Sequence, residues 1–209
     1  MSTEFVSRGG QKLRHALDIF RIDPRGYVCA DLGASTGGFT DCLLQAGAAK
    51  VIAVDTAYGE LAWRLRNDPR VAVLERTNAL HATPTEAVDL VVMDLGWTPQ
   101  RLAIPAAVKW LKRGAQGHGE TPGEGAGASG AGGGRIISLV KPHYEMKDQK
   151  RPLPPGGVLE DALAEDVAMS AIASLPALGV RVLGQTRSPL LGGSKGKGNA
   201  EWLVLVEPA

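Results

Sequence analysis

The stretch Asp31-Leu32-Gly33-Ala34-Ser35-Thr36-Gly37-Gly38-Phe39-Thr40 lies between a short apolar segment and a segment with helical periodicity. It predicts a glycine-rich turn from a strand into a helix. Gly33 lets the backbone turn tightly after the strand, and Gly37 and Gly38 leave room for a ligand at the helix N-terminus. Asp31 is expected to point into the same cleft. The stretch therefore indicates a site for a nucleotide-like cofactor, and the alternative is a glycine-rich turn that binds no ligand.

The spacing of the glycines separates two classes of cofactor. A dinucleotide fold requires G-x-G-x-x-G, with a pyrophosphate at the helix N-terminus. Here the glycines stand at positions 33, 37 and 38, and an acidic residue precedes the turn. This pattern favours the cationic end of a cofactor over a pyrophosphate, and it disfavours a nicotinamide-dependent oxidoreductase.

Composition bounds the class of protein. The chain has 209 residues, of which 44% are hydrophobic and 22% are charged, so we expect a single globular domain over residues 1–209, with an N-terminal helical segment at 1–26. The formal net charge of +1 means that any site for a polyanion must be a local patch. Cys29 and Cys42 are expected to be reduced, buried thiols, with no disulfide and no metal site. The absence of a membrane span or signal peptide from the sequence predicts a cytoplasmic protein without a membrane partner.

Segments typical of strands and helices alternate along the chain. Apolar residues recur with helical spacing over residues 9–20, 59–67, 99–113 and 159–178, and strand-like runs cover 27–31, 51–55, 71–74, 88–94, 135–141, 180–186 and 201–206. Such alternation predicts an α/β fold, a mostly parallel seven-stranded sheet with helices on both faces. The last two runs are joined by a Gly/Lys-rich loop at 192–198, so they predict a hairpin and one antiparallel strand.

Residues 114–134 differ from the rest of the chain. They are rich in glycine and show no apolar periodicity. We expect a flexible surface insertion between a helix and a strand. The alternative function is that of a lid, which would have to offset the entropy lost on ordering so many glycines.

Polar residues occur where the predicted strands end, and ligands of open α/β sheets bind at that edge. Asp55 follows Asp31 by 24 residues, the spacing at which an acid commonly accepts hydrogen bonds from a cofactor ribose. Asp94 ends an apolar run, and Asn78 lies just past the third strand. Lys141 precedes Pro142, and at the rim of a sheet a lysine can lose its proton and act as a base, or steer a hydroxyl. The alternatives are solvated acids and a lysine that extends into water.

Several stretches together resemble the FtsJ-like family of S-adenosylmethionine-dependent methyltransferases, in particular its TlyA (hemolysin A-like) branch of ribosomal RNA 2′-O-methyltransferases. The resemblance covers nearly the whole chain in the right order. The stretches are FVSRGGQKL at 5–13, DLGASTGGFTDCLL at 31–44, VD at 54–55, YGELAW at 58–63, LERTN at 74–78, VKP at 140–142 and GNAE at 198–201.

The resemblance implies a Rossmann-like class I methyltransferase with S-adenosylmethionine as cofactor and no metal. It places the family's catalytic tetrad on Lys12, Asp94, Lys141 and Glu201. Lys141 would accept or steer the proton of a ribose 2′-hydroxyl, Asp94 and Lys12 would hold the lysine and the hydroxyl in line with the methyl group, and Glu201 would complete the charge network. The cofactor-binding residues that it implies are Asp31, Gly33, Ala34, Ser35, Gly37, Gly38, Phe39, Asp55, Asn78 and Asp94.

The same resemblance implies RNA as partner, ribosomal RNA or a ribosomal subunit. Candidate phosphate contacts are Arg8, Arg14, Lys147, Lys150, Arg151, Lys195 and Lys197. The TlyA branch usually carries an S4-type RNA-binding domain before the Ser-Arg-Gly-Gly segment. This chain begins almost at that segment, which implies either a truncation or reliance on the catalytic domain to find RNA.

Two further alternatives stay open from the sequence. Trp97, in Leu95-Gly96-Trp97, replaces a Val-Ser-Phe-like stretch of the family and is interpreted either as a stacking partner for a base or as a core residue. The function alternative to an enzyme is a non-catalytic RNA- or ribosome-binding protein that keeps the methyltransferase fold.

Overall fold

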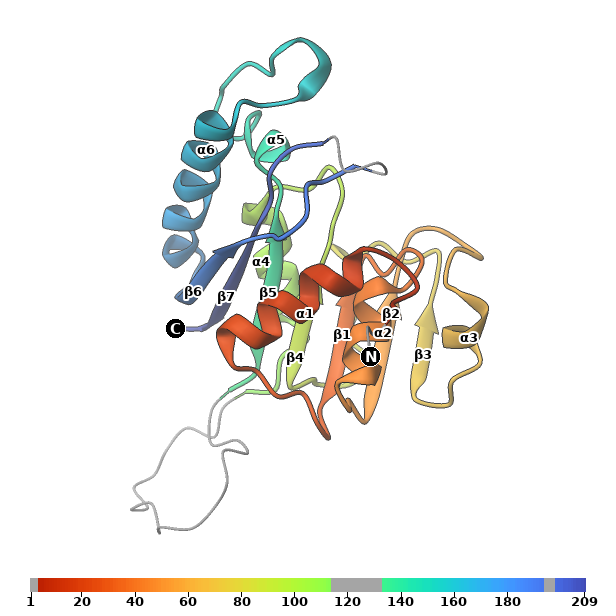
Figure 1. Ribbon diagram of the computed structural model, residues 1–209. Helices are drawn as coiled ribbons and strands as arrows, with labels where there is room; N and C mark the ends of the chain where they lie inside the picture. Colours follow the sequence, from red (N-terminus) through yellow and green to blue (C-terminus); the bar gives the residue numbers. More distant parts are fainter. Residues whose placement is uncertain (1–3, 114–132, 194–197) are drawn as a thin grey trace, which may run out of the picture.

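The sheet carries seven strands and is nearly all parallel. The computed structural model describes residues 4–113, 133–193 and 198–209. The strand order is β3-β2-β1-β4-β5-β7-β6, and β7 alone runs antiparallel to both of its neighbours (Figure 1). The strands are β1 (Val28–Leu32), β2 (Lys50–Val54), β3 (Val71–Leu74), β4 (Leu90–Met93), β5 (Arg135–Val140), β6 (Val180–Arg187) and β7 (Trp202–Pro208). The predicted α/β class and the terminal hairpin are confirmed.

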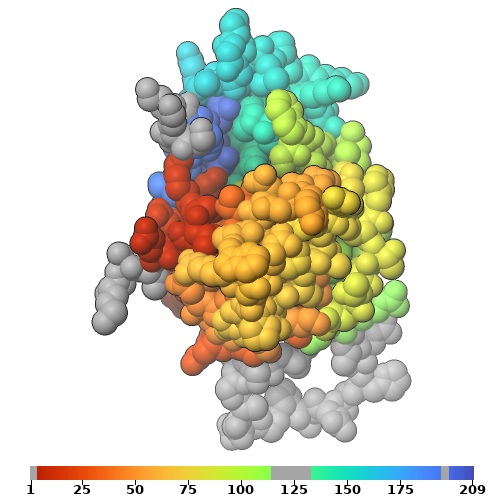
Figure 2. All heavy atoms as spheres, turned by 90° about the vertical axis from the view of Figure 1, so that its right-hand side faces the viewer, coloured from red at the N-terminus to blue at the C-terminus, as the bar shows by residue number. Residues whose placement is uncertain are grey.

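Helices cover both faces of the sheet, because successive strand residues point to opposite sides. Leu13 of α1 and Leu43 of α2 pack on one face with Val51, whereas Ile104 of α4 packs with Ile52 on the other. The helices are α1 (Gly9–Phe20), α2 (Gly38–Gln45), α3 (Trp63–Arg66), α4 (Gln100–Val108), α5 (Pro142–Glu145) and α6 (Asp161–Ser174). Figure 2 views the molecule from the β3 side, where residues near α3 form the near surface. No described helix is long and apolar enough to cross a bilayer.

The order of the strands reverses beside β1. The chain runs from β1 outward to β3 and then returns to place β4 on the other side of β1. The loops that follow β1 and β4 therefore leave the sheet as neighbours, at the point where open α/β sheets bind ligands. This topology brings the glycine-rich turn and Asp94 to one place.

Several predicted boundaries are wrong. The expected helix at 59–67 is only the single turn α3, because Gly59 has a φ of +79° and Ala62 has a non-helical ψ of 136°. The expected helix at 159–178 ends at Ser174 and continues as a 3-10 turn, Leu175–Leu178, since Pro176 lacks the N–H that a helix requires. Asp31 lies inside β1 and does not end it. The predicted insertion at 114–134 lies outside the described residues except for its last two positions.

Glycines allow α1 and α2 to pack closely. A Cβ at Gly38 would lie 2.9 Å from the backbone nitrogen of Gly10 and would overlap Ser7 Oγ. A Cβ at Gly37 would lie 2.8 Å from Leu61 and would overlap Leu65. These two glycines therefore make room for neighbouring parts of the protein, and that they also leave room for a ligand stays a prediction.

We expect Gly38→Ala to lower the free energy of unfolding by about 1–3 kcal/mol, because the new methyl group overpacks the contact between α1 and α2. Gly9→Ala is the matched control, since its Cβ would meet no atom closer than 3.4 Å. Urea denaturation of both variants measures the difference. Equal stabilities of the two variants would contradict the packing role of Gly38.

Candidate active site

The glycine-rich turn brings the end of β1 against the end of β4. Gly33 has a φ of +88°, and its N–H donates to Val54 O of β2 at 2.8 Å. A Cβ at Gly33 would lie 2.8 Å from the backbone oxygen of Asp94. Ala34 N–H also donates to Val54 O, so the turn is bound to the sheet before α2 begins. Phe39, a predicted cofactor contact, is 3% exposed and packs in the core beneath α1.

Asp31 is fully buried next to this turn. Its Oδ2 accepts a hydrogen bond from Thr40 Oγ1 at 2.6 Å, and its Oδ1 has no partner among the described residues. Burial raises the pKa of Asp31 to about 7; the Thr40 hydrogen bonds oppose the shift, and the charges of Asp94 and Asp55 add to it. A carboxyl oxygen left without a partner costs free energy, which a cationic or N–H-bearing ligand at this edge would recover. The site therefore fits the positively charged end of S-adenosylmethionine.

Asp55 and Asn78 lie farther along the same edge. Asp55 directly follows β2, and its carboxylate accepts hydrogen bonds from the N–H groups of Ser35 and Ala57, at 2.7 and 2.8 Å. Asp55 thus ties the glycine-rich turn to the loop after β2. Asn78 is exposed, and its side-chain oxygen accepts a bond from Leu80 N–H at 2.9 Å. A small hollow beside the turn is lined in part by Ala34, Ser35 and Asp55.

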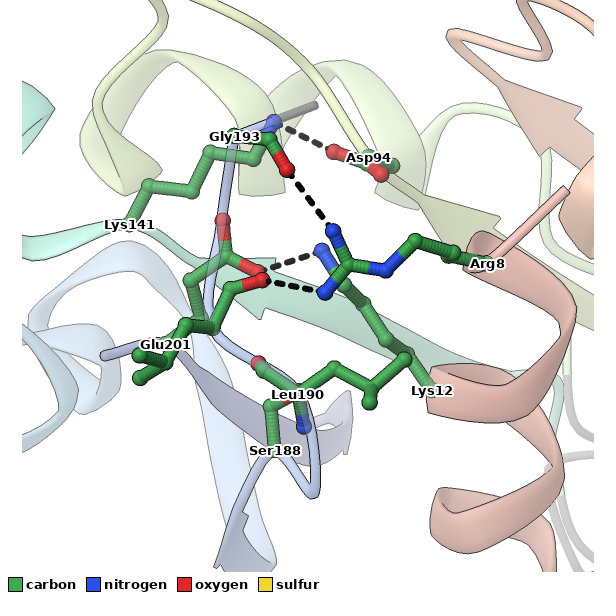
Figure 3. Close-up of polar contacts among 9 residues, drawn as sticks. Arg8, Lys12, Asp94, Lys141, Ser188, Leu190, Gly193 and Glu201 are labelled. Atoms are coloured by element: carbon green, nitrogen blue, oxygen red, sulfur yellow. Dashed lines mark hydrogen bonds and ion pairs between the residues drawn. The ribbon is translucent and has the colours of Figure 1, made fainter. Parts of the chain in front are cut away.

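Four charged side chains that are distant in sequence meet above the ends of β4, β5 and β7. Lys12 of α1 and Glu201 form an ion pair of 2.5 Å, with side-chain exposures of 10% and 3%. Lys141, directly after β5, forms a second ion pair with Asp94, directly after β4. Figure 3 shows the two pairs side by side, reached from α1 on one side and the sheet on the other. The structure thus brings the four predicted tetrad residues together.

The ammonium group of Lys141 in the second ion pair holds its proton tightly. Burial alone would lower the pKa of Lys141, but the charges of Asp94 and Glu201 and the hydrogen bond to Asp94 outweigh it, so the pKa of Lys141 is raised. The prediction that this lysine loses its proton easily at the rim of the sheet is wrong for the protein without ligands. Burial also raises the pKa of Glu201, and the ammonium of Lys12 opposes that shift.

Arg8 encloses the first ion pair. Its guanidinium donates to Leu191 O at 3.0 Å and to Gly193 O at 2.8 Å. Figure 3 shows the bond from Arg8 to Gly193. The segment 191–193 that Arg8 binds lies against the carboxylate of Glu201: a Cβ at Gly192 would be 2.5 Å from Glu201 Oε1. Arg8 thus fixes the loop that covers Glu201, and its predicted contact with a phosphate stays a prediction.

The other predicted phosphate contacts differ in their surroundings. Arg14 lies near Asp18, with 3.9 Å between the charged atoms, and Arg151 is paired with Asp166 at 2.6 Å. Lys147 and Lys150 are exposed in the segment after α5. Lys195 and Lys197 lie outside the described residues.

Trp97 lies beside the second ion pair. It is 85% exposed and has a φ of +57°, so the interpretation as a core residue is wrong. Its ring centroid is 4.9 Å from that of Tyr144, and Lys141 Nζ lies 5.7 Å from the same Tyr144 ring. An exposed indole thus stands near the charged groups and not in the interior.

Comparison with known proteins identifies the family. The sequence profile of the FtsJ-like methyltransferases matches residues 5–207. The chain belongs to the FtsJ-like methyltransferase family. Members of this family take their methyl group from S-adenosylmethionine, so the predicted enzyme class and cofactor are confirmed.

Two curated relatives and one solved structure place the chain within this FtsJ-like family. The chain is 43% identical over 204 residues to the 16S/23S rRNA (cytidine-2′-O)-methyltransferase TlyA of Mycobacterium tuberculosis, covering 96% of this chain and 67% of TlyA. It is 32% identical to Hemolysin A of Brachyspira hyodysenteriae, covering 96% of this chain and 76% of that protein. A solved structure described as a hemolysin from Streptococcus thermophilus superposes with a TM-score of 0.81 at 32% identity, over 100% of this chain and 69% of that one.

Two buried residues that link the segments of Asp94 and Lys141, namely Gln100 and Glu145, were not predicted from the sequence. Gln100 and Glu145 are buried and hydrogen-bonded to each other. Gln100 stands where a helix was expected to begin, and Glu145 follows the Lys-Pro pair. No local pattern distinguishes them from surface residues.

The pH dependence of stability follows from Asp31. Because the pKa of Asp31 is about 7 in the folded protein, and an unperturbed aspartate has a pKa near 4, the folded state keeps a proton that the unfolded state releases from about pH 4 to about pH 7. The contribution of Asp31 to stability therefore falls as the pH rises through this window. We expect the free energy of unfolding of Asp31→Asn, relative to wild type, to increase between about pH 5 and about pH 8 in urea titrations. Glu145 and Glu201 titrate in both proteins and cancel in the difference, so a constant difference would contradict the raised pKa.

Proposed function

We propose that this chain transfers a methyl group from S-adenosylmethionine to the 2′-hydroxyl of a ribose in ribosomal RNA. The observation that carries the proposal is the meeting of Lys12, Asp94, Lys141 and Glu201 as two adjacent ion pairs, at the sheet edge where Asp31 leaves an oxygen without a partner. The substrate class is taken from the name of the relative TlyA, of which the chain spans about two thirds.

The ion pairs fit the needs of this reaction. Bound S-adenosylmethionine supplies an electrophilic methyl carbon on a sulfonium that leaves as a neutral thioether. The ribose hydroxyl is a weak nucleophile, so the protein must orient its oxygen and remove its proton as the new bond to carbon forms. The ammonium of Lys141 donates a hydrogen bond to the hydroxyl oxygen and fixes its direction, while Asp94 holds Lys141.

The proton leaves by way of the same pair. A positive charge bound at this edge disfavours the ammonium form and lowers the pKa of Lys141. Lys141 can then give its proton to solvent through Asp94 and accept the hydroxyl proton. Lys12 and Glu201 complete the charge balance, and the loop held by Arg8 restricts water around Glu201.

The non-catalytic alternative predicts RNA or ribosome binding without methyl transfer. A protein that only binds RNA has no need of a buried ion pair such as Lys12 with Glu201, since buried charges are costly to desolvate. An assay of methyl transfer to ribosomal RNA distinguishes the two functions.

We expect tritium from labelled S-adenosylmethionine to appear in the ribose of ribosomal RNA, either free or in subunits, and Lys141→Ala to lower the rate by at least about 100-fold. Lys109→Ala is the matched control, because Lys109 is exposed at the far end of α4. Binding of the cofactor without label in any RNA would contradict the proposed reaction. An unchanged rate in Lys141→Ala would contradict the role of the lysine.

We further propose that Trp97 stacks on a base of the RNA. A stacked base contributes about 1–3 kcal/mol, so we expect Trp97→Ala to weaken RNA binding by about 5- to 100-fold and to leave the affinity for S-adenosylmethionine unchanged. Trp63→Ala is the control, since Trp63 is 77% exposed on α3, which packs beside the edge strand β3, whereas Trp97 follows the central strand β4. Equal losses of RNA affinity in the two variants, measured by fluorescence anisotropy, would contradict a specific role for Trp97.

A further inference from the structure

A buried polar cluster joins the segments that carry the second ion pair and takes no part in the chemistry proposed above. It consists of Gln100, Ser138 and Glu145, which are 4%, 1% and 4% exposed. Buried polar side chains cost free energy unless they are hydrogen-bonded, and the bonds of this cluster all join the same two segments.

Gln100 is the centre of the cluster. It is the first residue of α4, six positions after Asp94. Its backbone N–H donates to a Glu145 carboxyl oxygen at 2.9 Å, and its side-chain amide donates to Leu139 O at 3.2 Å and accepts from Ser138 Oγ at 2.7 Å. The partners of Gln100 flank Lys141 in sequence: Ser138 and Leu139 precede it, and Glu145 follows it.

The short helix α5, which carries Glu145, depends on tertiary contacts for its orientation. α5 has four residues, and a helix of one turn has little stability of its own. Lys141 lies between β5 and α5 and is the N-cap residue of α5, so the sheet fixes the backbone before the lysine and the direction of this turn fixes the backbone after it. The bond from Gln100 to Glu145 fixes α5 to the start of α4 and thereby to the loop of Asp94.

We propose that Gln100 and Glu145 are positioning residues, which join the loop of Asp94 to both sides of Lys141 and so hold the lysine in line for methyl transfer. This inference rests on the proposed function, and it adds two residues outside the tetrad. The pairing of β4 with β5 ends at Met93 and Ser138, so the bond from Gln100 to Glu145 is a link between the two loops beyond the paired strands. Without it, the N–H of Gln100 is buried and unpaired, and this link between the loops of Asp94 and Lys141 is lost. A displacement of about 1 Å between reacting groups can lower a rate by about 100-fold.

The chemistry of the bond supplies a conservative variant. A carboxyl oxygen accepts from an N–H whether or not the acid is ionised, and the amide oxygen of glutamine does the same. Burial raises the pKa of Glu145 to about 7; the bond from Gln100 and the charge of Arg101 oppose this shift, and Asp148 adds to it. Arg101 and Asp148 are paired with each other nearer the surface. Glu145→Gln therefore keeps the contact, whereas Glu145→Leu removes it at similar volume.

The test compares these variants in single-turnover methylation of ribosomal RNA under saturating conditions, below the unfolding temperature of each protein. We expect Glu145→Leu to lower the rate constant by about 10- to 100-fold, with KM for RNA and the affinity for S-adenosylmethionine unchanged. Glu145→Gln is expected to restore the wild-type rate constant. Gln149→Ala is the matched control, since Gln149 lies just after α5 and its side chain bonds Val167 O of α6, not α4.

Each outcome has one meaning. A wild-type rate constant in Glu145→Leu overturns the positioning role, and a Glu145→Gln variant as slow as Glu145→Leu overturns it too, because the carboxyl group itself would then be required. If Glu145→Leu does not fold, Ser138→Ala removes one bond of Gln100 with a smaller change in volume, and its wild-type rate constant would overturn the inference. Absence of methylation by the wild-type protein would instead overturn the proposed function.

Discussion

The close approach of Gly33 to the backbone of Asp94 is the constraint on which the site depends. Strands β1 and β4 are neighbours at the point where strand order reverses, and their loops share one space. Only a residue without a Cβ leaves the Asp94 carbonyl where it is, 2.8 Å from the position that a side-chain carbon would take. The same turn places the buried Asp31 behind it and Asp94 in front, so one backbone contact aligns the cofactor edge with the second ion pair.

The ion pair of Lys12 with Glu201 joins the first helix to the residue just before the last strand, across 189 residues of sequence. Two buried charges are expensive to remove from water, and apolar residues of similar volume would often give equal or greater stability. Loss of one partner alone leaves an uncompensated charge and costs about 3–5 kcal/mol. The pair is therefore better explained by the proposed chemistry of the site than by stability. That chemistry would make α1, which packs on one face of the sheet, a part of the active site.

The sequence predicted what depends on local patterns. Alternating apolar runs gave seven strands, the hairpin of β6 and β7, and the charged residues that follow β2, β4 and β5. Contacts between distant segments were beyond it: Arg8 was interpreted as a phosphate contact because nothing in residues 5–13 reveals the carbonyls of Leu191 and Gly193. The packing role of Gly37 and Gly38 was also beyond local patterns, because the leucines and the helix α1 that pack against these glycines come from other parts of the chain. The family resemblance grouped the tetrad, but it carried no information on Gln100 and Glu145.

The protonation of the site follows from the balance of its charges. The groups that gather at this edge include four acids and two lysines, namely Asp31, Asp55, Asp94, Glu201, Lys12 and Lys141. With a pKa of about 7, Asp31 is partly protonated near neutral pH, and the raised pKa of Lys141 keeps that lysine charged. A cation bound here favours ionised Asp31 and neutral Lys141, and by linkage each proton released strengthens the binding of the cation. In the proposed mechanism, cofactor binding and preparation of the lysine to accept a proton are then one coupled equilibrium, so a lysine that is protonated in the free protein would serve as a base in the complex.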